Sequence, residues 1–133
     1  EAARNAALVD TGFDCIDLSR GLPAHAGSVA ILDVLQFVPP DAQQPLLRQA
    51  AQRVTAGGRL VIRTGLAGHD WRARVTRGVD VFSRLVGWMN TGPRRYPSKE
   101  ELEALLAGEG LSTRFRPLWG RTPFNNWLVV ASR

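Results

Sequence analysis

The chain has 133 residues, enough for one packed domain, because a domain near this size buries about two-thirds of the surface that its unfolded chain exposes. Its hydrophobic content of 44% and charged content of 22% are typical of a soluble globular protein and exclude a wholly disordered chain. The net charge of +5 rests on sixteen Arg and one Lys. The single cysteine, Cys15, excludes an internal disulfide, and no apolar run is long enough to span a membrane, so we expect a cytoplasmic protein.

The chain begins with Glu1-Ala2-Ala3-Arg4, without Met or a basic-then-apolar signal segment, which indicates a boundary with a missing upstream segment. The alanine-rich residues Ala2 to Val9 predict a short helix. Residues Phe13 to Leu18 predict a short strand, and Gly21-Leu22-Pro23 predicts the turn that follows it.

The apolar run from Val29 to Phe37 predicts a buried strand over Ser28 to Leu35, since a strand apolar on both faces suits the centre of a parallel sheet. Pro39-Pro40-Asp41 ends that strand and starts a helix. The apolar face of this helix consists of Leu46, Leu47, Ala50, Ala51 and Val54. Gly57-Gly58 ends the helix, and Arg59 to Thr64 predicts the next strand, which completes half of a β-α-β unit.

The second half of the chain begins with an amphipathic pattern that predicts a helix from Asp70 to Met89. Its apolar stripe, which we interpret as core, consists of Trp71, Val75, Val79, Phe82, Leu85, Val86 and Met89. Ser98-Lys99-Glu100-Glu101 matches a capping box and starts a further helix. That helix carries Leu102, Leu105 and Leu106 and ends at Gly108 to Gly110.

Two strands close the chain, at Ser112 to Leu118 and at Asn126 to Ser132. The turn residues Gly120 to Pro123 between them predict antiparallel pairing. We expect all strands to form one sheet, with the last strand antiparallel beside Arg59 to Thr64 and with helices packed on the faces.

The order of these motifs resembles class I S-adenosylmethionine (SAM)-dependent methyltransferases. Phe13 to Leu18 and Val29 to Pro39 resemble the family's third and fourth strands, and Val54-Thr55-Ala56-Gly57-Gly58 stands where the family has L-x-P-G-G, with Ala56 in place of Pro. The resemblance implies a partial Rossmann-like α/β sheet, mostly parallel with an antiparallel C-terminal strand. It also implies that residues 1–133 are the C-terminal part of a single methyltransferase domain.

The glycine-rich loop that holds the cofactor in this family has no counterpart in the sequence. Such a loop follows a strand, so that backbone amides and a helix N-terminus face the ligand. The only G-x-G, Gly108-Glu109-Gly110, follows a helix and is interpreted as a helix stop. We therefore expect the full-length protein to use SAM, and this chain by itself not to bind SAM and to associate with itself through an exposed sheet edge.

The resemblance also implies cofactor-binding residues. Asp17 corresponds to the position that approaches the adenine amino group, and Leu18 lies beside the ring. Asp33, Val34 and Gln36 border the methionine end of the cofactor and the substrate, at the strand end where open α/β sheets place ligands. The alternative for Asp17 is that it only caps a turn.

The substrate is expected to be a small or acyl-carrier-bound molecule, with an aromatic or polyene-like group suited to the aromatic and amide side chains of the last loop. The candidate substrate-binding residues are Arg74, Arg77, Trp88, Tyr96, Trp119, Arg121 and Asn125. The alternative for the loop is a packed corner in which Asn supplies turns.

The segment from Arg59 to Arg95 carries eight Arg against Asp70 and Asp80. The chain is more loosely similar to methyltransferases found beside carrier-protein-dependent aryl polyene or polyketide biosynthesis, which implies that this segment docks an acidic acyl carrier protein. The alternative is a solvated charged face.

The function that follows is methyl transfer from SAM, which needs alignment of donor and acceptor more than acid-base help, so no catalytic residue is assigned. His25 and His69 offer no zinc-ligand spacing, and no metal is expected. The alternative is a non-catalytic α/β binding or interaction module derived from the same scaffold. Nucleic-acid binding through the Arg-rich segment is less favoured, because no recognised binding motif accompanies it.

Overall fold

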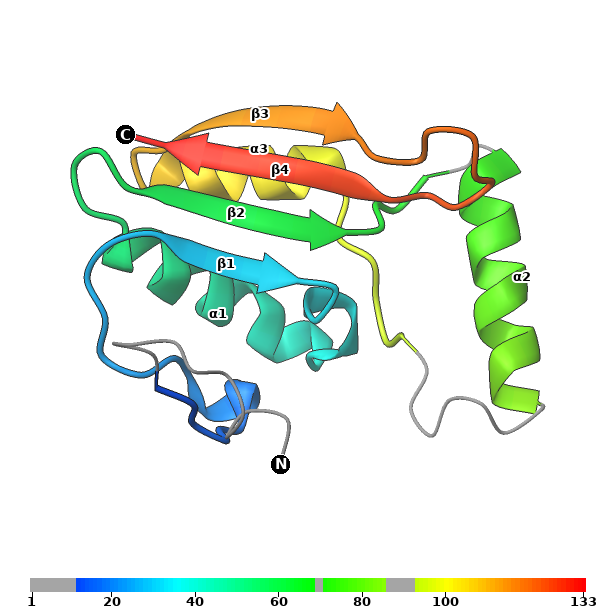
Figure 1. The fold of residues 1–133 in the computed structure, drawn as a ribbon, viewed down its shortest axis with the longest axis horizontal. Coiled ribbons are helices and arrows are strands. Elements are labelled where there is room, and N and C mark those ends of the chain that lie inside the picture. The colour runs from blue at the N-terminus through cyan, green and yellow to red at the C-terminus, as the bar shows by residue number, and fades with distance from the viewer. Residues whose placement is uncertain (1–11, 69–70, 86–92) are drawn as a thin grey trace.

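Four strands form one sheet in the order β1-β2-β4-β3 in the computed structural model, which describes residues 12–68, 71–85 and 93–133 (Figure 1). The strands are β1 (Val29–Leu32), β2 (Arg59–Thr64), β3 (Ser112–Pro117) and β4 (Trp127–Ser132). The helices are η2 (Leu18–Arg20), η3 (Leu35–Phe37), α1 (Pro40–Arg53), α2 (Trp71–Leu85) and α3 (Lys99–Gly108). The helix expected at Ala2 to Val9 lies outside the described residues.

The sheet has the expected connectivity. β1 and β2 are parallel, β4 is antiparallel to β2, and β3 is antiparallel to β4. The α/β architecture with an antiparallel C-terminal strand is therefore confirmed. In the described sheet β1 and β2 form the parallel pair. The β2–β4 and β3–β4 pairs are antiparallel, and both include β4 of the terminal hairpin.

Two strand predictions need correction. Residues 12–17 belong to no strand. Directly after them, backbone bonds from Arg20 N to Asp17 O (3.0 Å) and from Gly21 N to Leu18 O (3.3 Å) fold the chain into η2. The strand expected over Ser28 to Leu35 ends at Leu32. Asp33 adopts a φ of 56°, a left-handed conformation that turns the chain out of the sheet and into η3.

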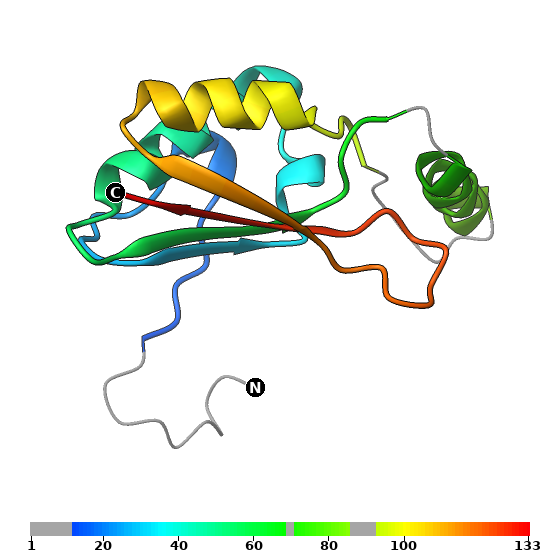
Figure 2. The same ribbon diagram turned by 90° about the horizontal axis from the view of Figure 1, so that it is seen from above.

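Helices α1 and α3 lie on the same face of the sheet (Figure 2). Strand side chains alternate between faces, and the buried members, such as Ile31, Ile62 and Val129, point towards these helices. The helices contribute the predicted apolar positions, which are all buried: Leu46, Leu47, Ala50, Ala51, Leu102, Leu105 and Leu106. The α1–α3 side of the sheet is thus the hydrophobic core.

The opposite face of the sheet is covered by none of the described helices. Ala30, Val61 and Val130 form one row across it. Leu32, on the same face beside this row, is 53% exposed. Exposed arginines share this face, at Arg59, Arg63, Arg114 and Arg116. The face therefore combines an apolar strip with a strong positive charge.

Helix α2 confirms the predicted periodicity but not the predicted burial. It stands beyond the C-terminal ends of β1 and β2 and does not pack on the sheet (Figure 1). Trp71 is 57% exposed and Phe82 is 60% exposed, so the apolar stripe is not core along this helix. Periodicity reports that a helix has an apolar side, whereas its packing partner is decided by the tertiary fold. The remainder of the predicted helix, from Val86 to Met89, lies outside the described residues.

Helix α3 begins and ends as predicted. The Ser98 hydroxyl accepts from Glu101 N, and the Glu101 carboxylate accepts from Ser98 N, which completes a capping box. This backbone bond lowers the pKa of Glu101 below its ordinary value, and Arg95 lowers it further. At the other end Gly110 takes a φ of 77°, so Gly108-Glu109-Gly110 is a helix stop before β3.

We expect the 133-residue chain, produced by itself, to associate through the edge of β1 that pairs with no other described strand. Face-to-face stacking would oppose two arginine-rich surfaces, so pairing of edges is favoured. Replacing Leu32→Lys places like charges at that edge and should shift the chain towards monomer in light scattering. The control is Leu118→Lys, at a residue that is 41% exposed and follows β3 at the far side of the sheet. A wild-type chain that stays monomeric at all concentrations would contradict the expectation.

Candidate cofactor site at the carboxyl end of β1

A solvent-open hollow of about 400 Å³ lies where the chain leaves β1. Its apolar lining comes from two segments: Ile16 and Leu18 before β1, and Val34, Phe37, Val38 and Pro39 after it. Asp17 and Arg94 also border the hollow. Open α/β sheets bind ligands at the carboxyl ends of their strands, and this is the hollow at that end of β1.

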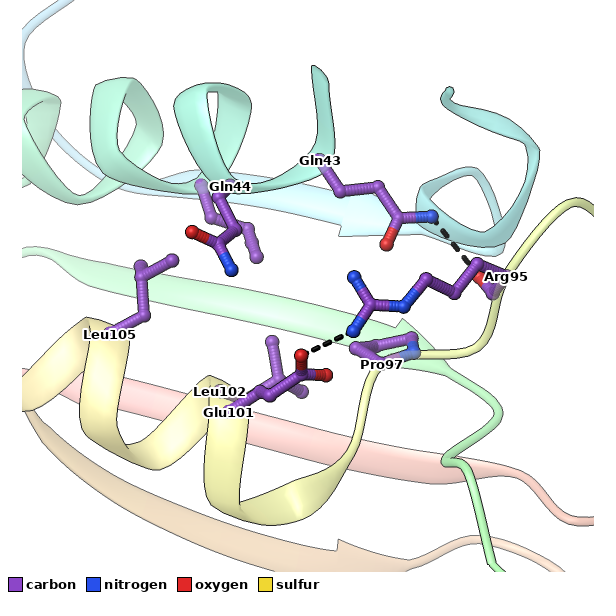
Figure 3. Close-up of a pocket in the computed structure, with 8 residues that line it drawn as sticks. Gln43, Gln44, Arg95, Pro97, Glu101, Leu102 and Leu105 are labelled. Atoms are coloured by element: carbon purple, nitrogen blue, oxygen red, sulfur yellow. Dashed lines mark hydrogen bonds and ion pairs between the residues drawn. The ribbon is translucent and has the colours of Figure 1, made fainter. Parts of the chain in front are cut away.

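The buried amide of Gln43 holds the backbone around this hollow. Its Nε2 lies 3.1 Å from Leu35 O, 3.2 Å from Val38 O and 3.1 Å from Arg95 O. Two of these carbonyls belong to the η3 turn, and the third belongs to the segment that precedes α3. Figure 3 shows the Gln43 amide directed at the Arg95 backbone while the Arg95 guanidinium turns to Glu101.

The space between Gln43, Arg95 and Glu101 is a seam between α1 and α3, not a ligand site. Its volume is about 10 Å³, which holds no more than one water molecule. The ion pair between Arg95 and Glu101 closes it on the α3 side (Figure 3). The larger hollow beside β1, by contrast, has room for an organic ligand.

The structure divides the five predicted cofactor residues into two groups. Asp17, Leu18 and Val34 border the hollow together. Gln36 is buried and holds the backbone instead, because its Nε2 donates to Asp33 O and its Oε1 accepts from the Thr64 hydroxyl at 3.2 Å. The Asp33 carboxylate forms an ion pair with Arg63 at 3.2 Å on the arginine-rich face.

The predicted substrate residues that the structure describes lie mainly around the loop between β3 and β4. Asn125 is buried, donates to Leu66 O and accepts from Trp127 Nε1 at 2.8 Å. Trp119 meets the Trp127 ring edge-on at 4.8 Å between centroids. Arg121, in the same loop, is exposed. This loop is therefore a packed corner with an exposed tip, and Asn125 organises it.

The other predicted substrate residues are spread over two further segments. Arg74 is exposed on α2. Tyr96 lies in the segment before α3, with its ring against Gly65. The side chain of Arg77 and the whole of Trp88 lie outside the described residues. The predicted residues whose side chains the structure describes thus come from three separate segments: α2, the segment before α3 and the loop after β3.

Sequence reasoning missed the residues that join α2 to the loop, and it missed Gln43, which holds the backbone beside the hollow. Arg72 donates to Thr122 O and stacks over Trp71 and Trp119, with 4.5 Å and 5.1 Å to the ring centroids. The Thr76 hydroxyl accepts from Asn125 N at 2.9 Å. Gln43 carried a usable signal, since it is a polar residue three and four positions before the apolar Leu46 and Leu47 on the same face.

Two kinds of site are not found in the described residues. No group of three or more His, Cys, Asp or Glu side chains there could hold a metal ion. No described helix is long and apolar enough to cross a membrane.

Comparison with known proteins gives matches in structure only. No protein-family model and no curated protein sequence matches the chain. An O-methyltransferase family protein from Burkholderia thailandensis matches with 23% identity and a TM-score of 0.57, over 80% of this chain and 31% of that one. Magnesium protoporphyrin IX methyltransferase from Synechocystis PCC 6803, with bound S-adenosylhomocysteine (SAH), matches with 19% identity and a TM-score of 0.61, over 89% and 48%.

A structure described as a pericyclic reaction enzyme also matches, with 19% identity and a TM-score of 0.58, over 98% of this chain and 33% of that one. The chain thus spans about a third to a half of the length of these structures. Other matching structures are complexes with SAM or SAH. The described residues therefore have the fold of class I SAM-dependent methyltransferases and related proteins, and the resemblance drawn from the sequence is confirmed at the level of fold.

The close contact at Gly65 gives a test of how this end of the molecule is held together. A Cβ at Gly65 would lie 2.6 Å from Tyr96 Cε1 and 3.2 Å from Asn125 O. Gly65→Ala should therefore lower the free energy of unfolding by about 1–3 kcal/mol in urea titrations, because an overpacked site must shift. Gly78→Ala on α2 is the control, since a Cβ there meets nothing within 4 Å. It should be neutral or stabilise by up to about 1 kcal/mol. Equal effects of the two substitutions would contradict the contact.

Proposed function

We propose that this chain is part of a SAM-dependent methyltransferase that acts on a small or acyl-carrier-bound molecule, and that it supplies the adenine end of the cofactor site. The observation that carries the proposal is the meeting of Asp17, Leu18 and Val34 around one hollow at the carboxyl end of β1. The fold is shared with structures that contain SAM or SAH, which supports the same cofactor for the full-length protein.

The residues present fit an adenine ring. Leu18, Val34 and Phe37 offer apolar contact area, and Asp17 offers a carboxylate that can accept the hydrogens of the exocyclic amino group. SAM, when bound, supplies a methyl group activated by its sulfonium. The role of this chain is then to bind and orient the cofactor, and we assign the carboxylate end of SAM to backbone amides of a glycine-rich loop elsewhere in the full-length protein.

The first test is a calorimetric titration of SAM and SAH into the full-length protein and its Asp17→Asn variant. Loss of the charged acceptor should weaken binding about ten- to hundredfold, as expected for a hydrogen bond to a charged group. Asp14→Asn is the matched control, since Asp14 is exposed in the same segment and does not border the hollow. The isolated chain should give no saturable signal with SAM. Unchanged affinity in Asp17→Asn would remove Asp17 from the site.

The acyl-carrier-bound class of substrate rests on the positive charge of α2 and its surroundings. Arg74 is exposed, and it lies one helical turn from Arg77. Reversing both charges to Glu in the full-length protein should weaken binding of an acidic acyl carrier protein about three- to tenfold at low salt, and less at high salt. Fluorescence anisotropy of a labelled carrier protein measures this. Reversal of Arg48 and Arg114, on α1 and β3, is the control, and an equal loss there would indicate attraction to net charge alone.

A non-catalytic binding module is the second candidate. The match to a protein described as a pericyclic reaction enzyme indicates that this fold is not restricted to methyl transfer, so the fold by itself leaves room for a role other than methyl transfer. A full-length protein that binds an acyl-carrier or small-molecule partner, but gives no heat with SAM or SAH, would support this candidate and overturn the methyltransferase.

A further inference from the structure

We propose that Arg94 is a second polar ligand of the adenine ring and that, together with Asp17, it distinguishes adenine from 6-oxopurines. This inference rests on the proposed function and adds a specificity-determining residue to it. Arg94 is 77 positions from Asp17 in the sequence, yet both residues border the same hollow.

The backbone of Arg94 is fixed at the carboxyl end of β1. Arg94 N donates to Gln36 O at 2.8 Å, and the next amide, Arg95 N, approaches the same oxygen at 3.4 Å. The carbonyl of Arg95 accepts from the buried Gln43 amide. The segment before α3 is thereby anchored on both sides of the peptide that follows Arg94, which keeps Arg94 at the hollow.

The two adjacent arginines have different surroundings. Arg95 is turned to Glu101 of α3, as Figure 3 shows, and it borders the narrow seam between α1 and α3. Arg94 is exposed and borders the large hollow. Of the residues that line this hollow, Arg94 is the one with a cationic side chain.

A carboxylate and a guanidinium around one apolar hollow match the edge of adenine. Adenine presents a donor, its 6-amino group, next to acceptor nitrogens, whereas guanine and hypoxanthine present an oxygen at position 6. Asp17 accepts from the amino group, and Arg94 donates to a neighbouring ring nitrogen. A 6-oxopurine would place its oxygen against the Asp17 carboxylate, and repulsion between two acceptors would exclude it.

The test measures binding of SAH and three analogues to the full-length protein by calorimetry: the 6-oxo analogue, the 7-deaza analogue and the 1-deaza analogue. Wild-type protein should bind SAH about tenfold or more tightly than the 6-oxo analogue. Arg94→Gln should weaken SAH binding about tenfold, as expected for a lost bond to a charged donor. The same substitution should not change the affinity for the deaza analogue that lacks the ring nitrogen contacted by Arg94 in the wild-type protein.

Arg48→Gln is the control for a lost positive charge, because Arg48 is exposed on α1 and pairs with Glu109 away from the hollow. It should leave SAH affinity unchanged, and thermal unfolding should show that Arg94→Gln folds like wild type. Unchanged SAH affinity in Arg94→Gln overturns the inference but not the proposed function. An equal loss for SAH and for both deaza analogues also overturns it, because it indicates an indirect effect. A wild-type protein that binds neither SAM nor SAH overturns both.

Discussion

The buried amide of Gln43 is the contact on which the carboxyl end of the sheet depends. Three backbone carbonyls from two distant segments converge on its nitrogen. Buried backbone carbonyls that have no partner in a sheet or helix need other hydrogen-bond donors. Here the donor is the side-chain amide of Gln43, near the start of α1. A nonpolar side chain at this position would leave the buried carbonyls without that donor. The free-energy cost of burying unpaired carbonyls is larger than the net stabilisation that the hydrogen bonds provide.

The η3 turn and the segment before α3 are consequently one structural unit. Gln36 supplies a carbonyl to Arg94 and Arg95 and an amide oxygen to Thr64 of β2, so the unit is also tied to the sheet. Of the apolar residues that line the hollow, only Val38 takes part in these bonds, and it does so through its backbone carbonyl. The lining is therefore held in place by groups that do not themselves face a ligand.

A second set of contacts, between α2 and the loop after β3, lies beyond this same end of the sheet. Asn125, Thr76 and Arg72 take part in hydrogen bonds between residues that are 49 to 59 positions apart in the sequence. The result leaves much of the apolar side of α2 exposed above the carboxyl ends of the strands. Large exposed apolar areas in soluble proteins are often sites of interaction, which is consistent with a substrate-facing position for this helix.

The sequence by itself determined the elements whose signals are local. Apolar runs predicted β2 and β4 to within a residue, and β3 was predicted as the partner of β4 across the turn at Gly120 to Pro123. The capping box predicted the start of α3, because capping depends on neighbours along the chain. The relation between β1 and β2 also followed from the sequence, since a short helix between two apolar strands leaves few connections.

Only the tertiary structure decided what depends on contacts between distant residues. Phe13 to Leu18 looks like a strand but has no strand partner in the described sheet. The stripe of α2 looks like core, yet Trp71, Val79 and Phe82 are exposed. Asp33 and Gln36 are three residues apart and look equivalent, yet one forms an ion pair with Arg63 and the other bonds a buried backbone. Arg94 reaches the hollow only because Gln36 and Gln43 bind the backbone beside it, and no local pattern contains that information.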